Sequence, residues 1–377
     1  MKRLSTIFLF VLLVTGCSDE PNSVGVGLLP RIDGLRVDSL RATALSSSNH
    51  RSNVTGTSTI ILLGRSGTLE ARTLLQFIGF PTTRMSSVVD SAVLSFTIAS
   101  RFLDSIGTVA LEVHRMNRSW AEASLTWDSL GPANLYSDTV DARINVAVSP
   151  ADSVLRIRVD SVAAHWLRDG NSSPYGIILI PAVSLRPVVL GLRNLDLITG
   201  TLFPRLTVAY HDTLGADSLN LTAYQGFFAG DCPAPAAAPT RIYLQAGVAY
   251  RGKLLFNVAS IPKNASISSA TLELHVDPAL SLLNQYSRDS LVASFLPDST
   301  KKDSIIYATL GVPSVSMTTF TFDVRNIVQN WVIGKPNQGI VLRAYGETWT
   351  FDRFALYDAY AAANLRPRLT IKYTVLP

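Results

Sequence analysis

Aromatic and charged side chains gather in one short stretch near the carboxyl end of the sequence. Residues 343–353 read Arg-Ala-Tyr-Gly-Glu-Thr-Trp-Thr-Phe-Asp-Arg, which places Tyr345, Trp349 and Arg353 around a glycine-bearing loop. A loop aromatic beside Arg and Glu suits a saccharide, because the ring stacks on a sugar ring while the polar groups bind its hydroxyls. The segment therefore predicts a glycan site. The open alternative is a hairpin whose aromatic side chains fold back onto the body of the protein.

A second aromatic cluster occupies residues 120–127, which read Trp-Ala-Glu-Ala-Ser-Leu-Thr-Trp. In an extended segment Trp120 and Glu122 share one face and Trp127 falls on the other. One interpretation is an aromatic platform for a sugar ring, with Glu122 binding its hydroxyls. The other is a corner packed by two large aromatics, in which Glu122 accepts hydrogen bonds from backbone amides at a turn.

Residue patterns typical of catalysis and of metal binding are absent from the sequence. It contains no nucleophile elbow, no His-Glu-x-x-His, no P-loop and no dinucleotide fingerprint, and only 6 glutamates. No two of its 5 histidines have the spacing of zinc ligands. We therefore expect no enzyme activity, no catalytic residue, no metal site and no cofactor, with calcium left open at aspartates such as Asp352 and Asp358.

The first residues have the pattern of a secretory leader. Lys2 and Arg3 precede an apolar run over residues 4–14, which is too short to span a bilayer comfortably. The run ends in Val-Thr-Gly-Cys, and small residues before Cys17 resemble the lipobox of bacterial lipoproteins, whose cysteine receives a diacylglycerol. The alternative is an ordinary signal peptide followed by a chance cysteine.

The lipobox resemblance implies a signal peptide at residues 1–16 and a lipidated tether at 17–34. Ser18, rather than Asp, follows the cysteine, which favours anchoring at the outer membrane or cell surface. Lipid chains at Cys17 would hold the protein on the membrane. Cys232 would then be the remaining cysteine, expected as a spare thiol, with an intermolecular bridge as the alternative.

The charge pattern argues against nucleic acid as a partner. The formal net charge is +5; Arg outnumbers Lys 26 to 7, and the Arg residues are scattered without forming runs. Removing Lys2 and Arg3 with the leader leaves 5 − 2 = +3. A weakly basic chain without a basic stripe does not match a nucleic-acid surface, but it favours mild attraction to acidic polysaccharide.

An internal duplication is the most informative feature of the sequence. Six segments recur in the same order: 38–44 with 217–223, 74–81 with 254–262, 91–98 with 269–276, 159–166 with 324–331, 175–179 with 338–342, and 204–210 with 367–373. The repeat length of about 165–180 residues is that of a domain rather than a solenoid unit. We therefore predict two tandem domains, at residues 35–211 and 212–377.

The matched segments predict strands. In residues 271–276 Leu272, Leu274 and Val276 share one face, opposite three polar residues. Such alternation indicates antiparallel sheets wetted on one side. The i, i+4 spacing of apolar residues predicts one short helix in each copy, at residues 162–167 and 327–332. Each helix carries a tryptophan near its end, Trp166 or Trp331, that we expect in the core. The predicted fold is all-β: two antiparallel β-sandwiches, jelly-roll-like, each with a short helical turn.

These segments resemble the DNRLRE family of bacterial β-sandwich modules, which are similar to carbohydrate-binding modules. The shared features are a leucine-rich strand ending in Pro, a Ser-Ala-x-Leu strand, the segment at 120–127, a helical turn ending in Trp and a closing Arg-Pro-Arg-Leu-Thr strand. The resemblance implies surface or secreted sandwiches, often appended to polysaccharide-active enzymes. The second copy lacks the Trp-x-Glu segment, so only the first copy would keep any binding face built on it.

Together these features predict a lipid-anchored surface protein that binds extracellular or cell-wall polysaccharide without cleaving it. The expected partners are a glycan and the membrane. The alternative is a structural or adhesive surface protein that makes protein–protein contacts. A lyase or hydrolase is a third possibility that no residue spacing supports.

Overall fold

The computed structural model describes most of the chain from Arg36 to Val375. The described residues are 36–51, 58–102, 104–121, 125–131, 135–169, 176–194, 203–231, 239–284, 290–302 and 304–375. The predicted leader and tether, and with them Cys17, lie outside these residues, as do Glu122 and Cys232.

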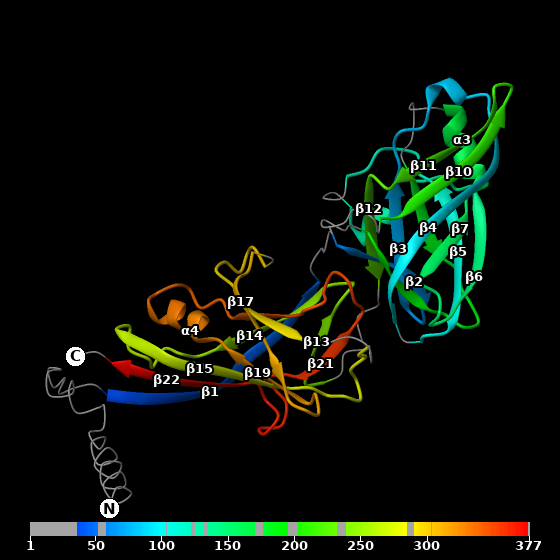
Figure 1. Cartoon of the computed structure of the whole chain (residues 1–377). Coiled ribbons are helices and arrows are strands. Elements are labelled where there is room, and N and C mark those ends of the chain that lie inside the picture. The colour runs from blue at the N-terminus through cyan, green and yellow to red at the C-terminus, as the bar shows by residue number, and fades with distance from the viewer. Residues whose placement is uncertain are drawn as a thin grey trace, which may run out of the picture.

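The chain forms two all-β lobes, each built on one 11-stranded sheet (Figure 1). The first lobe contains β2 (Ile60–Ser66), β3 (Leu69–Gln76), β4 (Val88–Phe102), β5 (Gly107–Arg115), β6 (Ala142–Val148), β7 (Val154–Arg158), β8 (Ile177–Pro181), β9 (Val189–Arg193), β10 (Arg205–Asp212), β11 (Gly215–Thr222) and β12 (Gln225–Asp231). The second lobe contains β1 (Arg36–Arg51), β13 (Arg241–Gln245), β14 (Tyr250–Phe256), β15 (Ala265–His275), β16 (Leu291–Phe295), β17 (Ile306–Leu310), β18 (Val312–Pro313), β19 (Thr319–Asp323), β20 (Ile340–Ala344), β21 (Arg353–Tyr357) and β22 (Arg368–Val375).

Each sheet curls into two layers around a long strand that changes partners. The first half of β1 pairs with β22 and its second half with β14, on either side of a register shift between Ala44 and Ser46. In the first lobe β4 passes from β10 to β9, with a shift between Ile98 and Ser100. A bulge bends a strand and increases its local twist, which lets one strand serve both layers. The predicted all-β, two-domain sandwich fold is confirmed.

Apolar side chains from alternating strand positions fill both lobes. Leu272 and Leu274 are fully buried in β15, as the alternation predicts, and the second lobe encloses them with Phe322. The first lobe has its own core, which includes Phe96 and Leu206. The two cores are therefore built by the period-2 pattern that the sequence displays.

The two predicted helices are present. They are α3 (Asp160–Asp169) and α4 (Arg325–Val332), and each buries its tryptophan, Trp166 or Trp331, in the core of its lobe. Gly334 follows α4 with a φ of +100°, a left-handed conformation that glycine adopts without strain.

The sheets divide the chain differently from the two sequence copies. We placed the domains at 35–211 and 212–377, but β1 pairs with β22 and β14 of the second lobe, while β11 and β12 pair with β10 and β3 of the first. The first lobe is therefore residues 58–231, inserted into a second lobe made of 36–51 and 239–375. The physical reason is that the closing strand of each copy pairs with the opening strand of the other copy.

Candidate functional site

A pocket of about 410 Å³ opens where the two lobes meet, and both lobes contribute to its wall. The lining residues are Ile60, Ala99, Ser100, Arg101, Phe102, Ser105 and Pro150 of the first lobe and Asn284, Trp349 and Thr350 of the second. One of them, Trp349, is a residue that the sequence predicts as a glycan contact. The volume lies within the range of roughly 300–1,000 Å³ that is common for small-molecule sites.

Contacts between the lobes hold the two walls of this pocket together. The rings of Phe102 and Phe351 meet edge to face at 5.9 Å between centroids. The Asn284 amide Nδ2 donates to the Arg101 carbonyl oxygen at 3.2 Å, and within the second lobe the Asn284 backbone N–H donates to Asp352 at 2.8 Å. Because Phe351 belongs to the core of the first lobe, the 343–353 segment is packed against both lobes.

A buried ion pair anchors the 343–353 segment to strand β14. Arg251 on β14 donates to both carboxylate oxygens of Glu347, at 2.8 and 2.6 Å, and the Glu347 residue is only 4% exposed. The Glu347 carbonyl oxygen also accepts from the Gly247 N–H. Gly247 has a φ of +74°, and a Cβ there would lie 2.5 Å from the Phe351 ring, so only glycine fits. Glu347, the acidic residue beside the predicted aromatic contacts, thus serves as an internal anchor.

The anchored segment presents two aromatic rings to one another. Tyr345 and Trp349 meet edge to face, with 5.5 Å between centroids and an interplanar angle of 89°. Tyr345 is 44% exposed, whereas Trp349 is partly buried and lines the pocket. The segment folds onto the protein, as the hairpin alternative predicts, and its indole borders the pocket. The glycan site stays a prediction.

Arg353 takes a different place from the one its position suggested. It begins β21, its backbone exchanges hydrogen bonds with Leu282, and it does not line the pocket. Its Nε is buried without a hydrogen-bond partner among the described residues. The structure thus groups Tyr345 with Trp349 but not with the Arg353 side chain.

Sequence reasoning missed the polar groups on the opposite wall. Ser100 Oγ and Arg101 Nε are both buried and have no hydrogen-bond partner within the described part of the chain. They lie at the end of β4, next to the bulge at Ile98 and Ser100, and bulges re-aim side chains beside functional sites. An unpaired buried donor loses about 1–3 kcal/mol relative to a paired one, so both groups cost stability where they stand. Ser100 and Arg101 both line the pocket, although these two atoms are sealed from solvent.

The charge of Arg101 is held at the pocket rim. Its Nη2 donates to the carbonyl oxygens of Ser149 and Asp152. The Ser149 backbone N–H and hydroxyl lower the pKa of the Asp152 carboxyl below its ordinary value, and the Arg101 charge lowers it further. Arg101 thus lines the pocket, whereas the Asp152 carboxyl, which stays ionised to acidic pH, lies outside its lining.

The other predicted aromatic cluster is packed into the first lobe. Trp120 is 8% exposed and belongs to a buried cluster with Leu74 and Phe227. The guanidinium of Arg72 lies over the Trp127 ring, 4.6 Å from its centroid. The described residues of this segment fit the packed corner rather than an exposed platform, and Glu122 lies outside them.

The aspartates considered for calcium bind backbone amides. Asp352 accepts from the Asn284 N–H at 2.8 Å, and Asp358 accepts from the Tyr360 N–H at 2.8 Å. Across the described ranges, no three His, Cys, Asp or Glu side chains converge as metal ligands. In the same part of the chain, neither helix has the length and apolar character needed to cross a membrane.

Comparison of the sequence with protein-family models and with curated proteins finds no match.

Proposed function

We propose that this protein is anchored at the cell surface through a lipid on Cys17 and binds extracellular or cell-wall polysaccharide without cleaving it. The observation that carries the glycan proposal is the pocket between the lobes, which Trp349 and Phe102 line together with Ser100 and Arg101. The resemblance of the repeated segments to DNRLRE modules supports the same proposal from the sequence. The lipid anchor rests on the lipobox-like residues before Cys17.

The wall chemistry matches the two-sided character of a sugar ring. A pyranose presents C–H groups on its faces, which pack on an indole, and oxygen acceptors around its edge. Phe102, Ile60 and Trp349 supply the apolar surface, while Ser100, Arg101 and Ser105 are the polar residues that the first lobe contributes to the wall. A guanidinium binds a carboxylate more strongly than a hydroxyl, so an acidic sugar is the favoured ligand.

Affinity electrophoresis in gels that contain acidic or neutral polysaccharides tests the proposal. We expect retardation in at least one acidic gel and its loss in Trp349→Ala, because removing a buried aromatic contact of about 1.5–3 kcal/mol weakens Kd roughly ten- to a hundredfold. Tyr224→Ala is the matched control, since Tyr224 is exposed and does not line the pocket. Unchanged mobility of the parent protein in every gel would contradict the proposal.

A second pair of variants tests the acidic preference. Arg101→Gln should weaken binding to acidic polysaccharide by roughly tenfold or more, since a charge-assisted hydrogen bond is lost, and should weaken binding to neutral polysaccharide less. Arg156→Gln removes the same charge from an exposed position on β7 of the same lobe and should have no effect. Equal losses for both variants would indicate a general charge effect rather than a site.

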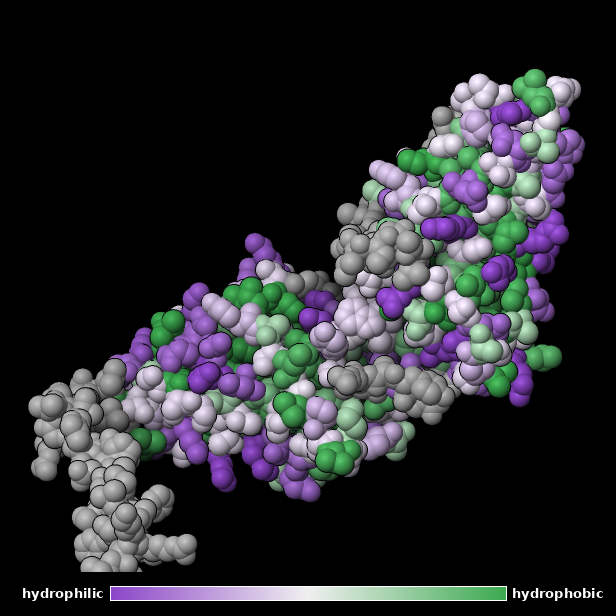
Figure 2. Space-filling view, in the orientation of Figure 1, coloured by the Kyte–Doolittle hydropathy of each residue, from purple (hydrophilic) through white to green (hydrophobic). Residues whose placement is uncertain are grey.

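Protein–protein adhesion is the second candidate function, and one observation favours it. Strand β17 ends the sheet of the second lobe, pairs with β16, and exposes Ile306, Tyr307 and Leu310. A sheet edge with apolar side chains is a template for pairing with another chain. On the face in Figure 2, however, hydrophobic residues are interspersed with polar ones over both lobes. Self-association abolished by Leu310→Lys, with no retardation in any gel, would favour adhesion over glycan binding.

A further inference from the structure

Aspartate followed by Ser or Thr and then by an aliphatic residue recurs throughout the chain. Of the 22 aspartates, 12 directly precede Ser or Thr, and in 11 of these 12 tripeptides the third residue is aliphatic. Ser and Thr make up 69 of the 377 residues, so chance predicts 22 × 69/377, or about 4, aspartates with such a neighbour. The tripeptide is therefore about three times as frequent as composition alone would make it.

Turn formation does not account for this excess. Asn forms the same side-chain turns as Asp, yet only 2 of the 16 asparagines precede Ser or Thr. The aspartates also make different contacts: Asp104 accepts from the N–H two residues on, Asp38 accepts from the next N–H, and Asp160 accepts from the Ala92 N–H on β4. One common local structure therefore does not require the tripeptide.

The tripeptides occupy different elements but share an accessible hydroxyl. They occur on β1 and β4, in the 3₁₀ helix η3 (Trp127–Leu130), at the start of α3 and in turns. All 12 hydroxyl residues lie in the described ranges, none of them is buried, and 8 are exposed. Of these 8, Ser129 and Ser161 donate to backbone carbonyls. The other six hydroxyls have no hydrogen-bond partner among the described residues; they belong to Ser39, Thr139, Ser153, Thr213, Ser218 and Ser304.

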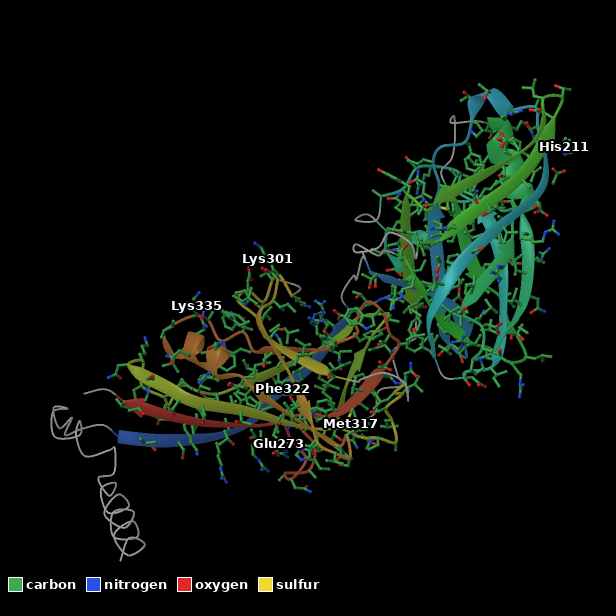
Figure 3. The ribbon with its side chains drawn as sticks, viewed as in Figure 1. His211, Glu273, Lys301, Met317, Phe322 and Lys335 are labelled. Atoms are coloured by element: carbon green, nitrogen blue, oxygen red, sulfur yellow. The ribbon has the colours of Figure 1, made fainter. Side chains whose placement is uncertain are left out.

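These sites are spread over both lobes. Figure 3 shows His211 at the outer tip of the first lobe and Lys301 on a loop that projects from the second, and Thr213 and Ser304 lie two and three residues from them. The buried hydroxyl residues of the described chain do not follow an aspartate; they are Ser58, Thr73, Ser294 and Thr350. A tripeptide shared by surface positions of unrelated local structure indicates that another molecule recognises the sequence itself.

The chemistry of the tripeptide favours a neutral modification of the hydroxyl. A phosphate would place a charge of about −1.5 to −2 directly beside the aspartate carboxylate, and like-charge repulsion opposes that arrangement. A sugar adds no charge and is bulky and solubilising. It would also shield the exposed third residues, such as Ile106 and Leu214, whose exposed fractions are 49% and 79%.

We propose that a glycosyltransferase of the host recognises this tripeptide and glycosylates its Ser or Thr. The hydroxyl oxygen forms a bond to the anomeric carbon of a sugar. The bond from that carbon to the diphosphate of an activated sugar donor breaks, and the hydroxyl proton passes to a base of the transferase. The aspartate carboxylate and the aliphatic side chain identify the acceptor. This modification needs neither the pocket between the lobes nor a lipid on Cys17, so its test is independent of glycan binding.

Mass spectrometry of the full chain purified from its native host tests the proposal, with the same chain from a host that lacks O-glycosyltransferases as reference. We expect electron-transfer dissociation of its peptides to place sugar residues on Thr139, Thr213 and Ser218. Thr43 is the internal control: like Ser39 it is exposed on β1 and precedes an aliphatic residue, but Ala42 precedes it. Peptides without sugar at every tripeptide, or with phosphate in its place, overturn the proposal. Equal modification of Thr43 does so as well.

Substitutions at exposed loop positions test whether the carboxylate is required. Asp138→Asn keeps Thr139 and the tendency to form a turn, and should lose the sugar on Thr139. Val183 is 81% exposed and precedes Ser184 and Leu185, so Val183→Asp completes a new tripeptide and should add a sugar on Ser184. Val183→Asn is the matched control and should leave Ser184 unmodified. Retention of the sugar in Asp138→Asn, or no gain in Val183→Asp, contradicts recognition of the tripeptide.

Discussion

At the scale of single residues, the buried pair of Arg251 and Glu347 governs whether the aromatic segment keeps its shape. Their side chains are 11% and 5% exposed, and Arg343 lies 4.0 Å from the same carboxylate. Burial lowers the pKa of the Arg343 guanidinium, and the Glu347 charge opposes that effect. The Glu347 carboxylate therefore compensates the charges of both Arg251 and Arg343.

We expect Glu347→Gln to destabilise the protein by about 3–5 kcal/mol, because removing one partner of a buried ion pair leaves an uncompensated charge. Urea unfolding followed by tryptophan fluorescence measures the loss. Glu273→Gln is the control: Glu273 is 34% exposed and lies 3.8–3.9 Å from His275 and Arg368, so its removal should cost less than about 1 kcal/mol. Equal effects of the two variants would show that the Glu347 pair is not structurally special.

The candidate site could be found from the sequence only where its residues are neighbours in the chain. Tyr345 and Trp349 lie four residues apart in one loop, so their proximity follows from local spacing. Ser100 and Arg101 come from the other lobe, and no local pattern connects them with Trp349. Trp120 could be judged only by its burial, because a tryptophan that stacks on a ligand and one that packs in a corner have the same sequence signature.

At the scale of elements, the two lobes repeat one strand exchange in the same register. Leu40 on β1 pairs with Ile371 on β22, and the repeat-equivalent Leu219 on β11 pairs with Val208 on β10. The alternation of apolar residues and the two short helices could be predicted because they are local. Which closing strand each opening strand joins could not be, because the copies are similar enough for either pairing to satisfy the period-2 pattern.

The turn from β10 to β11 is held by Asp212, which makes the exchange in the first lobe sensitive to acid. Asp212 accepts from Arg84 at 2.9 Å, from the Ser87 hydroxyl at 2.8 Å and from the Leu214 N–H at 2.7 Å. The Arg84 hydrogen bond is the largest cause that lowers the Asp212 pKa below its ordinary value of 3.8. A lowered pKa means that the ionised form stabilises the fold above that value, and that this contribution is lost as pH falls through the folded-state pKa.

We therefore expect Asp212→Asn to be less stable than the parent at pH 7 and to lose less stability between about pH 5 and pH 2. Arg84→Met should reduce the acid dependence in the same direction, because it removes the main cause of the pKa shift. Thermal melts over this pH range measure both. Asp152 and Asp298, whose pKa values are also lowered, are present in every variant, so part of the dependence of stability on pH remains. Parallel curves for parent and Asp212→Asn would contradict the assignment.

At the scale of the whole molecule, the insertion of the first lobe into the second determines which lobe lies next to the amino terminus. β1 starts beside the end of β22, where Arg36 pairs with Val375, and ends at Arg51, which lies 3.7 Å from Asp231 of the first lobe (Figure 1). A tether that precedes Arg36 therefore enters at the end of the second lobe farther from the first. Under the proposed lipid anchor, the second lobe stands next to the membrane, and the pocket and first lobe extend away from it.

The insertion also decides which fragments of the chain can fold. Residues 58–231 contain every strand of the first lobe, whereas 35–211, the boundary of the sequence copy, lacks β11 and β12. Without them β10 and β3 lose partners, and the buried Phe227 and Phe228 are missing from the first lobe. The shorter fragment also carries β1 without β14 or β22. Unpaired strand edges and exposed apolar residues favour aggregation over folding.

We expect fragment 58–231 to unfold cooperatively on heating and to give a dispersed amide NMR spectrum, and fragment 35–211 to do neither. Both fragments lose the contact between Phe102 and Phe351 alike, so that loss cannot account for a difference between them. Adding a peptide of residues 212–231 should restore cooperative unfolding to fragment 35–211, because it supplies β11 and β12 in trans. A fragment 35–211 that melts cooperatively without the peptide, at or above the midpoint of 58–231, would mean that the sequence copies, and not the sheets, are the folding units.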